Sequence, residues 1–203
     1  MDYPGYDNNR LANHMDQDYF EKLNTDLTSP IFNKATQQRT APGSTFKLVS
    51  AIAGVEDNLI DDGTVINCKG SFDLIQPPIN CWQKSGHGGL DLTSAIEQSC
   101  NVFFTTIGFM AGENKDGDFS ETTSLKTLKT YASMLDLDKK TGIEITESEP
   151  QISDQYAVPS YIGQERTCIP LVNWPDMLRP WQTKGQVLNC LCWTRPRTPR
   201  VTC

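Results

Sequence analysis

The clearest helical pattern of apolar positions begins after Pro42-Gly43. Apolar residues between positions 46 and 55 form a face broad enough for burial in a core. A second helix is predicted over residues 102–110, which are apolar nearly all round and are therefore expected to be buried. Apolar positions from 125 to 135 recur at helical spacing and predict a surface helix of about four turns.

Shorter elements are predicted between these helices. Residues 18–26 and 94–98 are expected to be helical, the second capped by Asp91 or Thr93. Strands are predicted over residues 65–68, 71–75, 79–82 and 142–145. Pro77-Pro78 makes a turn before residues 79–82, so this region is expected to be a hairpin.

Composition and charge place the chain among globular proteins. Its 203 residues are 37% apolar and 21% charged, with a formal net charge of −7, and they allow one large domain or two small ones. The acidic balance argues against a nucleic-acid partner. The sequence has no run long and apolar enough to span a membrane and no signal peptide after Met1, so an export signal or membrane anchor is expected to lie outside this chain.

The charge is divided unevenly near residue 165. Residues 165–203 carry six basic and two acidic side chains, a net charge of +4, whereas residues 1–164 are at −11. The same C-terminal segment holds three of the four tryptophans and four of the seven cysteines, without a helical or strand period. A composition break of this kind marks a boundary between two segments.

A serine and a lysine, Ser44 and Lys47, stand three residues apart where the first strong helix begins. Positions i and i+3 share one helix face, so the amine can lie beside the hydroxyl. A serine becomes a nucleophile only with an adjacent base, and a desolvated lysine with a lowered pKa can be that base. The backbone N–H at a helix N-terminus can also donate to an oxyanion. Taken alone, however, the pair also fits an N-cap serine and a solvated lysine.

A second polar motif, Ser99-Cys100-Asn101, lies between two predicted helices, 55 residues after Ser44. Ser99 could relay a proton to a leaving group, and Asn101 could hydrogen-bond a substrate amide. Together the two motifs favour a serine acyltransferase.

These motifs, with Asn33-Lys34-Ala35, residues 41–47 and Gly86-His87-Gly88, resemble the transpeptidase domain of class B penicillin-binding proteins of the elongation type. The resemblance covers residues 3–164 approximately. It implies an α/β (α+β) serine transpeptidase or β-lactamase-like fold. We therefore expect residues 1–164 to be a partial transpeptidase domain and residues 165–203 to be a non-homologous tail.

The resemblance also implies a function, the cross-linking of peptidoglycan. Ser44 would attack the penultimate D-alanine of a stem peptide that ends in D-Ala-D-Ala, and β-lactams would acylate the same serine. Lys47 would be the base, Ser99 the proton relay, and Asn101 a positioner of substrate or of Lys47. Catalysis would need no cofactor. A glycosyltransferase would be the partner, at the extracytoplasmic face of the bacterial cell membrane.

The family carries a third motif, Lys-Thr-Gly, on the strand beside its active site. Lys140-Thr141-Gly142 has these letters, but it lies only 39 residues after Asn101 and directly follows a predicted helix. We interpret it as a helix C-cap with Gly142 at the C′ position. The true motif is expected well beyond residues 161–164.

We attribute the loss of the Lys-Thr-Gly motif to a one-base deletion near codon 165. One codon choice from Asn173, read in the shifted frame, encodes Leu-Ala-Arg-Tyr-Val-Thr-Thr-Val-Ala-Asn-Lys, which resembles the helix that the family has there. The fold would then be incomplete: the helical subdomain would be present, the last sheet strands missing, and activity impaired. Sequencing the coding DNA tests this hypothesis.

Cys68, Cys81, His87 and Cys100 form a separate candidate cluster. Three thiolates and an imidazole make a closed tetrahedral Zn²⁺ site, and the resemblance adds that some elongation-type relatives have a zinc site in this region. The alternative is a Cys68–Cys81 disulfide across the hairpin, which an extracytoplasmic domain permits. Cys100 would then be a small buried residue beside the active site.

Two other functions stay open. A β-lactamase of the class that uses Ser-Thr-Phe-Lys, or a related β-lactam sensor, shares the first motif. Those proteins tend to have Ser-x-Val where this chain has Ser99-Cys100-Asn101. A non-catalytic remnant that binds a ligand or partner without chemistry would fit a chain that lacks the third motif.

Overall fold

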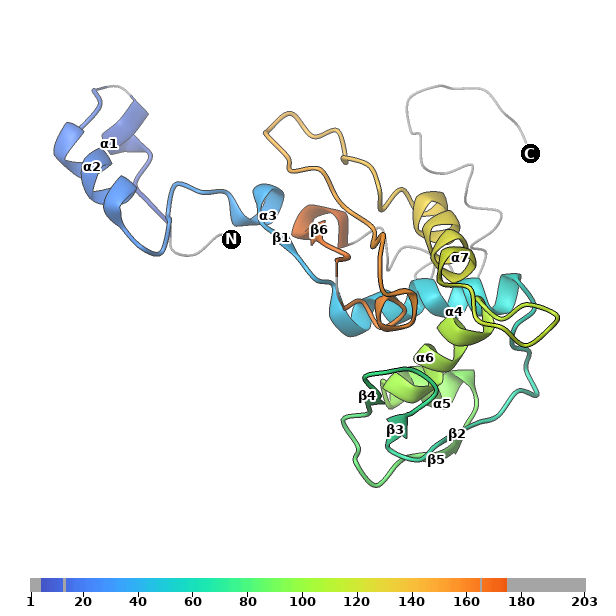
Figure 1. The fold of residues 1–203 in the computed structure, drawn as a ribbon. Helices are drawn as coiled ribbons and strands as arrows, with labels where there is room; N and C mark the ends of the chain where they lie inside the picture. The colour runs from blue at the N-terminus through green and yellow to red at the C-terminus, as the bar shows by residue number, and fades with distance from the viewer. Residues whose placement is uncertain (1–4, 13, 165, 175–203) are drawn as a thin grey trace, which may run out of the picture.

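A computed structural model describes residues 5–12, 14–164 and 166–174 of the chain. Figure 1 shows a body of packed helices with small strand pairs around it, and two N-terminal helices that lie apart from this body. The α-helices are α1 (Asn9–Ala12), α2 (Gln17–Thr25), α3 (Lys34–Gln37), α4 (Lys47–Glu56), α5 (Leu92–Glu97), α6 (Asn101–Met110), α7 (Glu121–Met134) and α8 (Ala157–Ser160). Two short 3-10 helices are η1 (Gly43–Phe46) and η2 (Leu171–Asn173).

The described strands form three separate antiparallel pairs. The pairs are β1 (Arg39–Thr40) with β6 (Ile169–Pro170), β2 (Ile66–Cys68) with β5 (Gly88–Leu90), and β3 (Ser71–Phe72) with β4 (Ile79–Asn80). The predicted hairpin is confirmed, since β3 and β4 pair on either side of Pro77-Pro78. The sequence pattern did not indicate β5, because its Gly-Gly-Leu sequence has no alternation of apolar and polar residues.

The core lies where α4, α6, α7 and α8 meet (Figure 1). Its fully buried large side chains include Phe46, Phe103, Phe104, Ile107, Leu128 and Tyr161. The predicted burial of the helix over 102–110 is confirmed, since α6 holds six buried residues. Side chains at the helix starts fix where the helices begin: Asp91 accepts the N–H of Ser94 at α5, and Ser120 accepts that of Thr123 at α7.

The predicted strand over residues 142–145 is wrong, and so is the helix C-cap at Gly142. Helix α7 ends at Met134 with Leu135 as its C-cap, and residues 141–150 contain no strand. The buried carboxylate of Glu147 accepts the N–H groups of Thr141 and Ile143 and the hydroxyl of Thr141, at 2.8–2.9 Å. This side chain therefore binds the backbone donors that a strand would have given to a neighbour.

The structure describes residues 166–174 of the expected tail. Ile169 and Asn173 are buried, and Cys168 exchanges two backbone hydrogen bonds with Gln151. These residues therefore pack with the body of the protein. Residues 165 and 175–203 lie outside the described residues, so the tail, the missing strands and the reading-frame shift stay predictions. In the described part of the chain, even the longest helix, α7 with 14 residues, falls short of a membrane span.

Candidate active site

The nucleophile candidate lies on a short helical turn that runs directly into α4. Ser44 is exposed on η1, whereas Phe46 at the end of η1 is fully buried and anchors the turn in the core. Gly43 begins the turn with a φ of +57°, a conformation that glycine adopts without the cost of a Cβ. The predicted helix start after Pro42-Gly43 is confirmed, with a first turn of 3-10 rather than α geometry.

Lys47 joins the two sequence motifs in space. Its side chain is buried, with only 3% of the residue exposed. Its Nζ donates to the carbonyl oxygen of Ser99 at 2.7 Å, to Ser99 Oγ at 3.0 Å and to Asn101 Oδ1 at 2.7 Å. The structure thus brings Lys47, Ser99 and Asn101 together across more than 50 positions of sequence, with Ser44 on the adjoining turn.

Burial changes the proton affinity of this lysine. Desolvation lowers the pKa of Lys47 to about 8, and the nearby Cys100 and Cys81 oppose the shift only in part. About a tenth of such a group is neutral at pH 7, against a negligible fraction for an ordinary lysine. The amine can therefore accept a proton near neutral pH.

Hydrogen bonds hold the Ser99–Asn101 segment at the start of α6. Ser99 has a φ of +48°, in the left-handed region that side chains rarely adopt. Asn101 is the first residue of α6, and its Nδ2 donates to the carbonyl oxygen of Asn80 at 3.0 Å. The role of Asn80 was missed because a backbone carbonyl leaves no sign in the sequence.

Residues 161–164 lie directly behind the nucleophile turn. Gly43 N–H donates to the carbonyl oxygen of Gly163 at 3.0 Å, and Ser50 Oγ donates to that of Tyr161 at 2.7 Å. Gly163 has a φ of +69°, and a Cβ added there would lie 2.1 Å from the carbonyl oxygen of Gly43. Only glycine fits this approach of two backbones. The sequence alone singled out the segment but not its contact with Gly43.

Lys140-Thr141-Gly142 lacks the strand context that a catalytic Lys-Thr-Gly motif needs. Glu147 binds Thr141 in the loop described above, and Lys140 Nζ forms an exposed ion pair with Glu149 at 2.7 Å. These contacts favour a structural role for the triplet in this loop, in place of the predicted helix C-cap.

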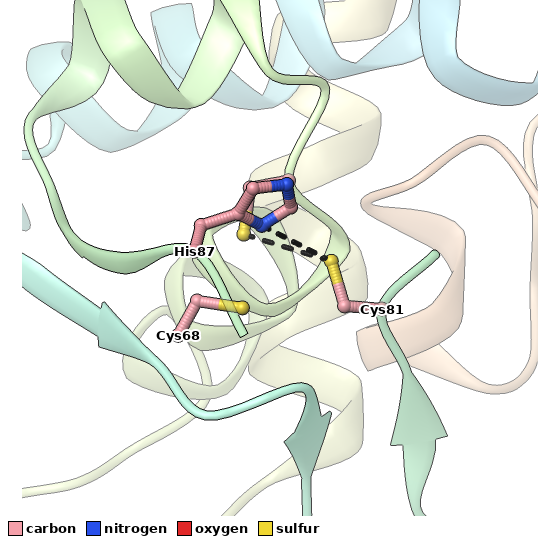
Figure 2. A group of neighbouring side chains, drawn as sticks. Cys68, Cys81 and His87 are labelled. Carbon is pink, nitrogen blue, oxygen red and sulfur yellow. Dashed lines mark hydrogen bonds between the residues drawn. The ribbon is translucent and has the colours of Figure 1, made fainter. Parts of the chain in front are cut away.

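The predicted cysteine and histidine cluster assembles behind the Ser99–Asn101 segment. Cys68 ends β2, Cys81 follows β4, His87 precedes β5 and Cys100 precedes α6. Their ligand atoms all lie within 4.8 Å of one another. Figure 2 shows Cys68, Cys81 and His87 converging from separate segments. The structure carries the three cysteines as free thiols, without the alternative Cys68–Cys81 disulfide.

Two distances within the cluster match those of a tetrahedral Zn²⁺ site. With Zn–S bonds of about 2.3 Å, two sulfur ligands lie about 3.8 Å apart. Cys81 Sγ is 3.9 Å from Cys100 Sγ and 3.6 Å from His87 Nδ1. Burial raises the pKa of the Cys100 thiol to about 12, so a metal ion would have to displace its proton.

Comparison with known proteins agrees with the family resemblance of the sequence motifs. The family model described as "Penicillin binding protein transpeptidase domain" matches residues 4–168. A curated relative, the peptidoglycan D,D-transpeptidase MrdA of Haemophilus influenzae, is 30% identical over 146 residues, which cover 71% of this chain and 21% of the relative. The chain thus spans about a fifth of the length of this relative.

Two solved structures show the same fold. Penicillin-binding protein PBP2 of Pseudomonas aeruginosa, in complex with WCK 5153, superposes with a TM-score of 0.77 at 18% identity, covering 89% of this chain and 42% of that one. A ceftriaxone acyl-enzyme complex of penicillin-binding protein A from M. tuberculosis gives 0.75 at 18% identity, covering 89% and 40%. The predicted serine transpeptidase fold is confirmed. The family match extends to Cys168, slightly beyond the expected limit at Gln164.

Proposed function

The chain belongs to the penicillin-binding protein transpeptidase family, and from this membership we propose that its site forms a serine acyl-enzyme in elongation-type peptidoglycan D,D-transpeptidation. The donor is a stem peptide that ends in D-Ala-D-Ala, and β-lactams acylate the same serine. In the full-length protein the domain lies at the extracytoplasmic face of the cell membrane and works with a glycosyltransferase.

The observation that carries this proposal is the environment of Lys47. A buried amine with a pKa of about 8 contacts Ser99 Oγ and Asn101 Oδ1 and lies one helical turn after Ser44. A structural lysine would instead extend its charged end into water. Lys47 is desolvated, and none of these contacts is with a carboxylate that would stabilise its charged form. A lysine in such surroundings gives up its proton more readily and can act as a base.

The residues have distinct roles in the proposed reaction. Neutral Lys47 accepts the hydroxyl proton as Ser44 Oγ bonds to the penultimate D-alanine carbonyl carbon. The C–N bond to the terminal D-alanine breaks, and a proton delivered through Ser99 leaves with its amine. An acceptor amine then forms an amide bond with the acyl carbon, the ester to Ser44 breaks, and one amine proton returns to Ser44 Oγ. Asn101 positions Lys47 and the substrate amide.

Labelling with a fluorescent penicillin tests the acylation step. We expect one covalent label per chain, located on Ser44 by peptide mapping and lost in Ser44→Ala. Ser85→Ala, an exposed serine outside the site, should label normally. Absence of label in folded protein would favour the non-catalytic remnant, whereas rapid turnover of nitrocefin would favour a β-lactamase.

We also propose that Cys68, Cys81, His87 and Cys100 hold a structural Zn²⁺ ion. The ion would supply a cross-link and no step of the reaction. Because Cys100 lies between Ser99 and Asn101, the cross-link would fix this motif from behind.

Metal analysis of the purified chain tests the zinc proposal. We expect about one equivalent of zinc, lost in Cys81→Ser and retained in Cys168→Ser, a cysteine outside the cluster. A chelator should lower the melting temperature of the parent chain but not that of Cys81→Ser, because metal binding contributes directly to folding. A Cys68–Cys81 bridge in a peptide map would instead establish the disulfide.

A further inference from the structure

The segment from Asn80 onward runs beside the Ser99–Asn101 motif in the opposite direction. Asn80, the last residue of β4, accepts a hydrogen bond from Asn101 Nδ2 through its carbonyl oxygen, at 3.0 Å. The next residue, Cys81, has its Sγ 3.9 Å from Cys100 Sγ. Two successive residues of this segment therefore contact two successive residues of the motif.

Trp82 continues this series of contacts. Its indole Nε1 donates to the carbonyl oxygen of Gln98 at 2.9 Å. Gln98 is the C-cap of α5 and immediately precedes Ser99, and carbonyl groups at the end of a helix lack partners within the helix. The indole N–H thus binds the backbone at the point where α5 ends and the motif begins.

Burial does not explain the place of Trp82. The residue is 60% exposed, whereas tryptophan is highly buried on average, so it gains comparatively little from the hydrophobic effect. The ring of His87 packs edge-on against the indole, with the ring centroids 5.0 Å apart and an interplanar angle of 67°, and this contact orients the indole. The hydrogen bond to Gln98, by contrast, is directed at the motif.

We propose that the indole N–H of Trp82 is a positioning group for the acylation reaction, an inference that rests on the proposed function. It acts through Gln98 on Ser99, whose carbonyl oxygen and Oγ both accept hydrogen bonds from Lys47 Nζ. Ser99 has a left-handed φ of +48°, a conformation that persists only where the surrounding structure restrains it. A hydrogen bond on the preceding carbonyl supplies part of that restraint and so helps to hold the acceptors of the base.

Two substitutions at position 82 separate the hydrogen bond from the ring. Trp82→Phe removes the indole N–H and part of the ring, whereas site-specific incorporation of 3-benzothienylalanine keeps both fused rings and replaces the N–H by sulfur. Acylation by a fluorescent penicillin is measured as a function of its concentration. We expect both variants to bind penicillin with nearly the parent affinity and to acylate about three- to ten-fold more slowly at saturation, the size of one hydrogen bond. A residue that only supports the fold would instead lower the fraction of protein that is labelled.

Hydrogen exchange gives a second readout that does not depend on the nucleophile. The N–H groups of Ser99 and Cys100 bond to carbonyl oxygens of α5, so their exchange reports local opening of the motif. In both variants these two amides should exchange about three- to ten-fold faster, since one restraint is lost. The amides of α7 should exchange at the parent rate. Leu74→Ala, which removes another exposed side chain between β3 and β4, should match the parent in both measurements.

The benzothienylalanine protein decides the inference even if Trp82→Phe folds poorly. Acylation at the parent rate in that protein, or parent-like exchange of the Ser99 and Cys100 amides, would overturn the proposal, because the ring alone would then suffice. Absence of penicillin labelling in the parent chain would count against the proposed function. Amide exchange would still show, in that case, whether the indole N–H restrains the motif.

Discussion

Replacing Lys47 with methionine should lower the rate of penicillin acylation at Ser44 by about 10²- to 10⁴-fold, the usual contribution of a general base. Methionine keeps an unbranched side chain of similar reach in the core but cannot accept a proton. Stopped-flow or gel-based labelling with a fluorescent penicillin measures the rate. Lys129→Met removes an exposed lysine of α7 and should label at the parent rate.

The pH dependence of acylation identifies Lys47 more specifically than the rate alone. Burial lowers the pKa of Lys47 to about 8, and only the neutral amine can act as a base. The acylation rate of the parent chain should therefore rise with pH through about 8 and level off above it. In Lys47→Met this rise should disappear. A rate that is independent of pH between 6 and 9 in the parent chain would contradict the assignment.

The same shift in pKa affects stability. The folded-state pKa of Lys47 lies below the ordinary lysine value of 10.5, so between pH 8 and 10.5 the unfolded chain binds more protons at this position. The contribution of Lys47 to the free energy of unfolding therefore rises with pH over that window and is least favourable below pH 8.

Gly163→Ala is expected to destabilise the protein and to suppress labelling of Ser44 together. The left-handed backbone alone costs an alanine about 1–2 kcal/mol, and the overlap with the carbonyl of Gly43 should bring the total to roughly 3 kcal/mol or more. For a chain of this size that corresponds to a fall in melting temperature of about 6 °C or more. The displaced turn carries Ser44, so penicillin labelling should fall as well.

Gly142→Ala is the matched control for this substitution. Gly142 has a φ of +78°, similar to that of Gly163, but no atom lies within 4 Å of an added Cβ. Gly142→Ala should lose only the backbone conformational contribution to the free energy of unfolding. Its Ser44 should be labelled by penicillin as in the parent chain. Equal destabilisation by the two substitutions would mean that the contact between the Gly43 and Gly163 backbones contributes nothing.

The sequence predicted the elements that local chemistry determines. The apolar faces of α4, α6 and α7 were sufficient to predict these helices, and the cap at Asp91 was sufficient to predict the start of α5. Helix periodicity and capping both act within a few residues. It failed at residues 142–145, where the side chain of Glu147, rather than a neighbouring strand, accepts the backbone N–H groups of Thr141 and Ile143. It also missed β1, β5 and β6, whose two or three residues are too short for a period to be visible.

The candidate site was predictable as a set of residues but not as an arrangement. Spacing and resemblance pointed to Ser44, Lys47, Ser99, Asn101 and the four metal-ligand candidates. That Lys47 is buried against Ser99 and Asn101 depends on how α4 packs on α6, which no local pattern encodes. Asn80 acts through its backbone carbonyl, which its residue type does not reveal. The need for glycine at position 163 becomes visible only when the backbone of Gly43 is placed beside it.

The hydrogen bond from Ser50 to Tyr161 joins positions 111 residues apart, and this has a consequence for how the protein is made. During synthesis the nucleophile's turn emerges long before the segment on which it rests. Closing so long a loop is slow relative to forming the helices, so the turn is set late in folding. Reactivity of Ser44 with penicillin would then report that a nascent chain has been extended through α8 and has folded that far.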